Sequence, residues 1–233
     1  MKHFAHNFKY AFGTIIGIRG VMRYRPSIQL VGHAHGRVVH QRRIAVLAER
    51  LAGMLPAAST LLDVGCGDGT IAKTMCQAIP GLAISGAEYS PRPKCAIPCI
   101  AFDGVHLPFP SRSFDGCMFV DVLHHSRDPL AVLLEAGRIS RDFILIKDHL
   151  AEGTFDHWTL RLMDWVGNRP HGVELPYAYL SGEQWQEIYR DAGLVEVKTD
   201  RAIPLYPAPF SLVFGRNLHF ISVLTKLEQR TPQ

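Results

Sequence analysis

The fold follows from the stretch Leu61-Leu62-Asp63-Val64-Gly65-Cys66-Gly67-Asp68-Gly69-Thr70, in which a short apolar run leads into alternate glycines. The apolar run is typical of a parallel strand that is covered on both faces. The glycines allow a sharp turn and let a ligand approach the backbone closely. A helix that starts near Thr70 would direct its free amide groups at that ligand. The stretch therefore predicts a buried strand, a nucleotide-binding turn and a helix.

The spacing of the glycines and the acid before them indicate which kind of nucleotide is bound. A dinucleotide fingerprint reads G-x-G-x-x-G, and its third glycine serves helix packing. Here the pattern is D-x-G-x-G-x-G, which runs from Asp63 to Gly69 and carries a second acid at Asp68. Negative charge is unfavourable beside a pyrophosphate, but it suits a ligand that carries an ammonium and a sulfonium group.

Three more predicted strands end in acidic residues. The first of them ends at Glu88, about 20 residues after the turn, where an acid that bonds ribose hydroxyls is expected. The strands and the acids that follow them are Leu82–Ala87 with Glu88, Ile97–Phe102 with Asp103, and Phe114–Val120 with Asp121.

This order of motifs resembles the class I S-adenosylmethionine-dependent methyltransferases, and among them the small-molecule branch called methyltransferase type 11. The resemblance covers roughly residues 58–150 and includes the linker Leu107-Pro108-Phe109-Pro110 and the ending Asp121-Val122-Leu123-His124-His125. It implies S-adenosyl-L-methionine as the cofactor. It also implies a doubly wound, Rossmann-like α/β fold with a seven-stranded, mostly parallel sheet whose last strand is antiparallel.

The resemblance also implies roles for the residues at the strand ends. Asp63, Gly65 and Gly67 are expected at the methionine end of the cofactor, Glu88 at its ribose and Asp103 at its adenine. The other positions expected along the cofactor are Cys66, Tyr89, Gly104, Asp121 and Val122.

Histidines near strand ends are the candidate catalytic bases. In methyl transfer the protein holds donor and acceptor in line and, for a hydroxyl acceptor, removes its proton. A neutral imidazole titrates close to working pH and suits that task. The candidates are His149, after the predicted fifth strand Phe143–Ile146, and His124 and His125, after the fourth. A structural role is an equal alternative for each.

Residues 151–180 follow the fifth strand and are expected to form a substrate lid. Within this insert, apolar residues from Phe155 to Val166 recur at helical spacing, and the helix is expected to end at Gly167-Asn168. A capping box at Ser181 is expected to start the next helix. The candidate substrate contacts are Trp158, Trp165, His171 and Tyr177.

The acceptor is expected to be a small molecule that is methylated on oxygen, carbon or nitrogen. Members of the family that methylate amino groups of bases carry an Asn/Asp-Pro-Pro-Tyr/Phe motif after the fourth strand, whereas this chain has Asp121-Val122-Leu123-His124. Nucleic acid is therefore disfavoured. The basic amino-terminal segment and the aromatic insert favour an amphiphilic acceptor that resembles a lipid, a quinone or a polyketide.

The amino-terminal segment differs from the rest of the chain in charge. The formal net charge of the whole chain is +4, yet residues 1–48 contain no Asp or Glu. Residues 1–40 are expected to form a basic and aromatic cap, and residues 41–233 the methyltransferase domain. Residues 1–27 could instead contact a membrane surface or form a targeting segment. Val31–Arg37 is expected to form a histidine-rich turn and His40–Leu55 a packing helix.

Composition limits the class of protein. With 233 residues, 47% hydrophobic and 20% charged, one α/β domain with a full core is expected. The five cysteines form no C-x-x-C pair and are typical of reduced thiols in a cytoplasmic protein. Cys95 and Cys99 lack a second ligand pair nearby, so no metal site is predicted. Two alternatives stay open: a non-catalytic protein of the same fold, and an NAD-dependent oxidoreductase, which the glycine spacing disfavours. The oligomeric state is not predicted.

Overall fold

The computed structural model describes residues 26–168, 179–206, 211 and 217–227, and for residues 26–39 and 164–168 it describes the backbone only. The chain divides into two compact units, residues 1–38 and 39–233, and the second contains the sheet. Residues 1–25, which make up most of the predicted cap, lie outside the described residues. Within the described part of the chain, every helix is too short or too polar to cross a membrane.

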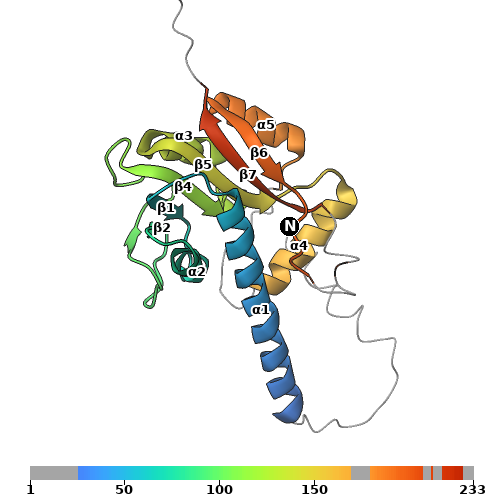
Figure 1. Cartoon of the computed structure of the whole chain (residues 1–233). Coiled ribbons are helices and arrows are strands. Elements are labelled where there is room, and N and C mark those ends of the chain that lie inside the picture. Colours follow the sequence, from blue (N-terminus) through green and yellow to red (C-terminus); the bar gives the residue numbers. More distant parts are fainter. Residues whose placement is uncertain (1–25, 169–178, 207–210, 212–216, 228–233) are drawn as a thin grey trace, which may run out of the picture. The chain divides into compact units, whose positions relative to one another are not determined.

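A sheet of seven strands forms the centre of the second unit, in the order β3-β2-β1-β4-β5-β7-β6 (Figure 1). Strand β7 is antiparallel to both of its neighbours, and the pairs from β3 to β5 are parallel. This arrangement confirms the predicted Rossmann-like sheet with an antiparallel last strand. The strands are β1 (Thr60–Val64), β2 (Ala83–Glu88), β3 (Cys99–Ala101), β4 (Phe114–Val120), β5 (Ser140–His149), β6 (Leu194–Asp200) and β7 (His219–Lys226).

Helices cover both faces of the sheet because the side chains of each strand alternate between two apolar layers. Leu62 of β1 packs in the layer under α3 and α5, whereas Leu61 packs in the layer under α2 and the end of α1. Each fully buried leucine of this kind contributes about 1.5–3 kcal/mol to stability. The helices are α1 (Pro26–Met54), α2 (Thr70–Ala78), the 3-10 helix η2 (Leu123–His125), α3 (Pro129–Ile139), α4 (Thr154–Asn168) and α5 (Gly182–Asp191).

Local signals fix the beginnings of the helices that follow β4 and β5. Asp128 caps α3 by accepting the Ala131 N–H at 2.9 Å, and Pro129 occupies the first turn, where its missing donor costs nothing. At α5, Ser181 and Gln184 form the predicted capping box. Helix α4 is described as far as Asn168, the residue at which the sequence predicts its end.

The connection between β2 and β3 contains no helix, and its sequence is short and rich in proline. Its end is fixed by backbone hydrogen bonds to its neighbours. The Ala96 N–H donates to the Asp68 carbonyl at 2.8 Å, and the Gly86 N–H donates to the Pro98 carbonyl at 2.7 Å. These bonds hold residues 95–99 against the glycine-rich turn.

The prediction of a histidine-rich turn over Val31–Arg37 is wrong, because these residues lie within α1. A glycine inside a helix costs about 1 kcal/mol relative to alanine. No proline interrupts the segment between Pro26 and Pro56, so the hydrogen bonds of the neighbouring helical residues outweigh the cost of Gly32 and Gly36. The predicted helix His40–Leu55 forms the second half of α1, where Leu47 and Leu51 are buried.

Candidate functional site

The turn after β1 has the backbone conformation that its glycines permit. Gly65, Gly67 and Gly69 have φ angles of 74°, 59° and 71°, in the left-handed region that glycine adopts without strain. A Cβ atom on Gly65 would lie 2.5 Å from a methyl carbon of Val122, so this glycine also allows the end of β4 to pack against the turn. The Gly67 N–H donates to Glu88 Oε2 at 2.7 Å, which ties the turn to the end of β2.

Asp63 of β1 is a buried acid behind this turn. Its Oδ1 has no hydrogen-bond partner among the described residues. Burial, together with the negative charge of Glu88, raises the pKa of Asp63 to about 7. Asp63 and Glu88 thus place two carboxyl groups beside the glycine-rich turn, and Asp63 has a buried oxygen that can accept a hydrogen bond. This arrangement fits a cofactor that carries an amino group, positive charge and ribose hydroxyls.

The ends of β2 and β3 carry Asp103, which is predicted to lie near adenine, and Tyr89, which is predicted to lie along the cofactor. The Asp103 carboxylate accepts hydrogen bonds from the N–H groups of Val105 and His106 at 2.8 and 2.7 Å, and its other oxygen lies 2.8 Å from His106 Nδ1. These bonds, the His106 ring first, lower the pKa of Asp103 to about 2. The exposed Tyr89 ring packs beside Gly104, where a Cβ atom would lie 3.5 Å from the ring. Tyr89 and Asp103 therefore lie at one edge of the sheet.

A second group of polar side chains lies where β4 and β5 end and the antiparallel strand β7 begins, and we call it the strand-end cluster. Its members come from three neighbouring strands and the 3-10 helix η2, and most of them are buried. They are Asp121, His124, Lys147, Asp148, His149 and His219.

Asp121 is the most strongly paired acid of the strand-end cluster. It has a positive φ of 58° and forms ion pairs with Lys147 and with Arg43 of α1. Burial by itself would raise the pKa of Asp121, but Lys147 and Arg43 hold it well below its usual range. Burial lowers the pKa of Lys147, and the Asp121 charge opposes that effect. The two cations keep Asp121 ionised.

Asp148 organises the histidines of the strand-end cluster. It lies 2.6 Å from His124 Nδ1 and accepts the N–H groups of Leu123 and His149 at 3.0 and 2.7 Å. Burial would raise the pKa of Asp148, but the charge and hydrogen bond of His124 bring it below its usual range. A fixed carboxylate of this kind sets the tautomer and orientation of the imidazole that it contacts.

His149 lies between the two acids of the cluster. Its Nδ1 is 3.7 Å from Asp121 Oδ1 and 3.3 Å from His124 Nδ1. Burial, and after it the charges of His124 and Lys147, lower the pKa of His149. The imidazole is therefore neutral at neutral pH and can accept a proton. The Tyr179 ring packs against it, with centroids 5.9 Å apart.

The structure brings most of the predicted site residues into two adjoining groups. Asp63, the glycine turn and Glu88 form the first, and Asp121, His124 and His149 belong to the second. Val122 contacts Gly65 and so joins the two groups. The His125 ring lies 4.0 Å, centroid to centroid, from that of His124.

Of the predicted substrate contacts, the structure describes only the side chain of Trp158. Trp158 projects from α4 with 64% of its side chain exposed, and the Arg161 guanidinium lies 5.8 Å from its ring centroid. The side chain of Trp165 is not described, and His171 and Tyr177 lie outside the described residues.

Sequence reasoning missed several members of the strand-end cluster. Lys147 and Asp148 precede His149 directly, and three polar residues in a row at the end of a buried strand are a signal that could have indicated both. Arg43, Tyr179 and His219 come from distant segments, and their residue types alone give no such signal.

The comparisons with known proteins agree with this geometry. A family model described as a methyltransferase domain matches residues 37–199. The chain belongs to this methyltransferase-domain family. The cofactor of the domain is S-adenosyl-L-methionine, as the resemblance implies, and the residues of the glycine-rich turn fit it. The family favours this cofactor over NAD.

Relatives of the methyltransferase domain include a curated enzyme and several solved structures. The 27-O-demethylrifamycin SV methyltransferase of Amycolatopsis mediterranei (strain S699) is 34% identical over 122 residues, and the match covers 43% of this chain and 45% of the relative. The chain thus matches less than half the length of that relative.

Two solved structures show the fold. A chain of the complex between the Haloferax volcanii Trm112 methyltransferase activator and a methyltransferase has a TM-score of 0.65 at 16% identity, with 85% of this chain and 96% of that chain covered. The 1,6-didemethyltoxoflavin-N1-methyltransferase of Burkholderia thailandensis, solved with 1,6-didemethyltoxoflavin and S-adenosylhomocysteine, has a TM-score of 0.59 at 18% identity, with 87% of each chain covered.

Proposed function

We propose that this protein methylates a hydroxyl group of a small amphiphilic molecule, with His149 as the base that accepts the hydroxyl proton. The observation that carries the proposal is a buried imidazole whose Nδ1 lies 3.7 Å from Asp121, a residue expected along the cofactor. The lowered pKa of His149 favours its neutral form. The family assignment supports methyl transfer as the reaction.

The residues of the site have separate tasks in this reaction. When bound, S-adenosyl-L-methionine supplies the activated methyl group. The glycine turn and Glu88 hold the cofactor, and the Asp121 carboxylate stabilises positive charge on His149 when its ring takes up a proton. Asp148 orients His124, whose ring packs edge-on against His149 with centroids 4.5 Å apart. His124 and Asp148 therefore act as positioning residues.

An apolar surface on α4 supports an amphiphilic acceptor. Phe155, Trp158 and Leu162 are 65%, 64% and 52% exposed, although their spacing puts them on one face of the helix. The opposite side of α4 packs through Leu160 against Tyr179, which in turn contacts His149. The same helix thus joins an exposed apolar stripe to the wall of the proposed catalytic centre, where an acceptor with a ring or chain would find contact area.

The name of the curated relative supports oxygen as the accepting atom. That enzyme is a methyltransferase for 27-O-demethylrifamycin SV, and its acceptor is a polyketide hydroxyl. We extend this chemistry to the present chain as part of the proposal and include quinone-like and lipid-like hydroxyl compounds in the acceptor class.

A methyl-transfer assay tests the proposal. The protein is incubated with S-adenosylmethionine labelled in its methyl group and a panel of hydroxylated polyketides, quinols and lipids, and methylated products are identified by mass spectrometry. We expect His149→Gln to lower kcat by roughly 10²–10⁴-fold with S-adenosylhomocysteine affinity unchanged. Arg141→Ala, which removes an exposed ion pair with Asp115 at the other end of β4, serves as the matched control.

The pH profile separates a base from a structural residue. A base that must be neutral gives a rate that falls toward low pH, and His149→Gln should abolish that limb. If His149→Gln kept kcat within a few-fold of the native value, His149 would be excluded as the base. Cofactor binding without product from any acceptor would favour the non-catalytic alternative.

A further inference from the structure

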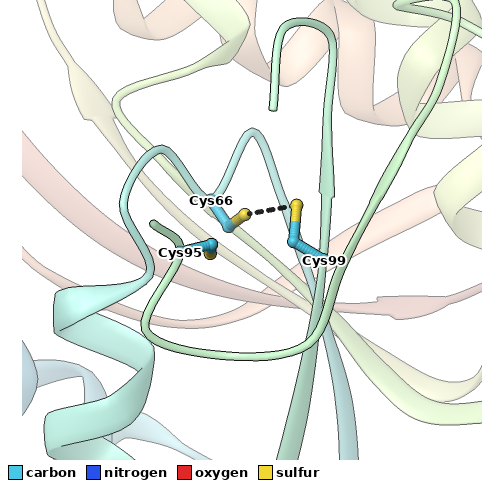
Figure 2. Close-up of side chains that lie close together, drawn as sticks. All are labelled: Cys66, Cys95 and Cys99. Carbon is cyan, nitrogen blue, oxygen red and sulfur yellow. Dashed lines mark hydrogen bonds between the residues drawn. The ribbon is translucent and has the colours of Figure 1, made fainter. Parts of the chain in front are cut away.

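Three cysteines from separate segments converge beside the glycine-rich turn. Cys66 lies in the turn after β1, Cys95 in the loop between β2 and β3, and Cys99 at the start of β3. Figure 2 shows the Cys66 and Cys99 side chains pointing toward each other, with Cys95 beside Cys66. Their sulfur atoms all lie within 4.8 Å of one another, and those of Cys66 and Cys99 are 3.5 Å apart. All three residues are half-buried, so ions can reach them from solvent.

Two glycines make room for these thiols. A Cβ atom on Gly86 of β2 would lie 2.4 Å from the Cys66 sulfur, and one on Gly69 would lie 2.9 Å from the Cys95 sulfur. Real Cβ atoms do not approach other atoms so closely. The sulfur atoms therefore occupy space that any side chain at Gly69 or Gly86 would fill.

The loop that carries Cys95 and Cys99 is held in place by the backbone. The hydrogen bonds from Ala96 to Asp68 and from Gly86 to Pro98 lie on either side of Ile97. They attach the loop both to the glycine-rich turn and to β2. The three thiols are thus positioned before any ligand binds, which lowers the entropic cost of binding one.

The distances fit a tetrahedral thiolate site. Zinc binds cysteine sulfur at about 2.3 Å, so two ligating sulfurs of a tetrahedron are about 3.8 Å apart. The observed separations, 3.5 Å for one pair and at most 4.8 Å for the others, bracket that value. Glu88 adds negative charge near Cys99, which favours a cation at the site.

We propose that Cys66, Cys95 and Cys99 form a zinc site next to the cofactor turn. On binding, each thiol releases one proton to solvent, and the three thiolates and one water complete the coordination of the ion. The sequence prediction of no metal site considered only Cys95 and Cys99, and the parallel pairing of β1, β2 and β3 supplies the third ligand. A disulfide would use two of these sulfurs and give the third no role.

Cobalt substitution in the full-length protein tests the zinc site. The protein is reduced with a phosphine that does not bind metals and titrated with Co²⁺ and then with Zn²⁺. We expect one Co²⁺ per chain, with thiolate-to-cobalt charge-transfer bands in the near ultraviolet that disappear as Zn²⁺ displaces the ion. Cys95→Ser and Cys99→Ser should each weaken zinc binding by about tenfold or more. Cys76→Ser on α2, outside the cluster, is the matched control.

Alkylation provides a second readout that needs no variant. Zinc should protect Cys66, Cys95 and Cys99 from iodoacetamide and leave the reactivity of Cys76 unchanged, as measured by mass spectrometry of peptides. The proposal would be overturned if both serine variants kept the native zinc affinity or if the charge-transfer bands were missing. It would also be overturned if His219→Leu, and not the cysteine variants, lost metal binding. A Cys66–Cys99 disulfide found in the protein as purified, before reduction, would also overturn it.

Discussion

The Asp148 carboxylate lies 2.6 Å from the Nδ1 atom of His124, and the two side chains are 0% and 2% exposed. The same carboxylate accepts the backbone N–H of Leu123, so it holds both the imidazole and the start of the 3-10 helix η2. One acid at the end of β5 therefore determines how the end of β4 is arranged. Removing it leaves two buried N–H groups without their acceptor and takes away the carboxylate that His124 contacts.

Asp148→Ala should destabilise the protein strongly. Leaving a buried donor without its acceptor costs about 1–3 kcal/mol, and Asp148 accepts two buried backbone N–H groups in addition to its contact with His124. We expect a loss of that size in the free energy of unfolding, measured by urea denaturation at pH 7.

Arg141→Ala is the exposed counterpart of this test. Arg141 contacts Asp115 at 2.7 Å with 43% of its side chain exposed. An exposed pair contributes about 0–1 kcal/mol, so this variant should unfold near the native urea midpoint. Equal losses in the two variants would contradict the assigned role of Asp148.

Glu88→Ala should weaken cofactor binding. The variant loses the predicted ribose acceptor and the acceptor of the Gly67 N–H, which lies 2.7 Å away. Hydrogen bonds to a charged group contribute about 1.5–3 kcal/mol, which corresponds to a roughly tenfold to hundredfold weaker affinity for S-adenosylhomocysteine. Calorimetric titration measures the change, and Glu187→Ala on the exposed face of α5 is the control. Native affinity in Glu88→Ala would refute the assignment of Glu88.

Gly65→Ala should disturb the cofactor turn, whereas Gly137→Ala should not. At Gly65 the φ of 74° and the contact with Val122 both oppose a side chain, and the left-handed conformation alone costs about 1–3 kcal/mol. Gly137 lies in α3, where a Cβ atom would meet no neighbouring element within 4 Å, so alanine there should stabilise by about 0.5–1 kcal/mol. Thermal unfolding and cofactor titration of the two variants check this contrast, and equal stabilities would contradict it.

His219 should make stability depend on pH. Burial, and after it the charges of Lys147 and His149, hold the pKa of His219 well below its usual value near 6.5. Its Nε2 is buried without a hydrogen-bond partner among the described residues. Below pH 6.5 the unfolded chain binds a proton that the native protein does not, so His219 stabilises the fold above pH 6.5 and this contribution is lost as the pH falls.

His219→Leu should flatten that dependence. Between about pH 6.5 and pH 5 the native protein should lose up to about 1.4 kcal/mol per pH unit more than the variant, because one proton is involved. Urea denaturation at several pH values measures the difference. If the free energy of unfolding depended on pH in the same way in both proteins, His219 would not titrate in the way described.

The sequence by itself determined the features that depend on neighbouring residues. The glycine-rich turn, the capping box at Ser181 and the order of strands and helices all follow from short-range patterns, because conformational preference and helix capping act over a few residues. The strand-end positions of Glu88, Asp103 and Asp121 follow in the same way, and with them the class of cofactor.

Only the tertiary structure decided which distant side chains meet. Asp121 pairs with Arg43, 78 residues away, and Cys66 contacts Cys99, 33 residues away. The sequence pattern of α4 indicates one apolar face but not that it stays exposed at Trp158. Local patterns fix the direction of a side chain relative to its own strand or helix, whereas its partners depend on which elements pack beside it. The strand-end cluster and the three-cysteine group therefore exist only once the order of the strands in the sheet is set.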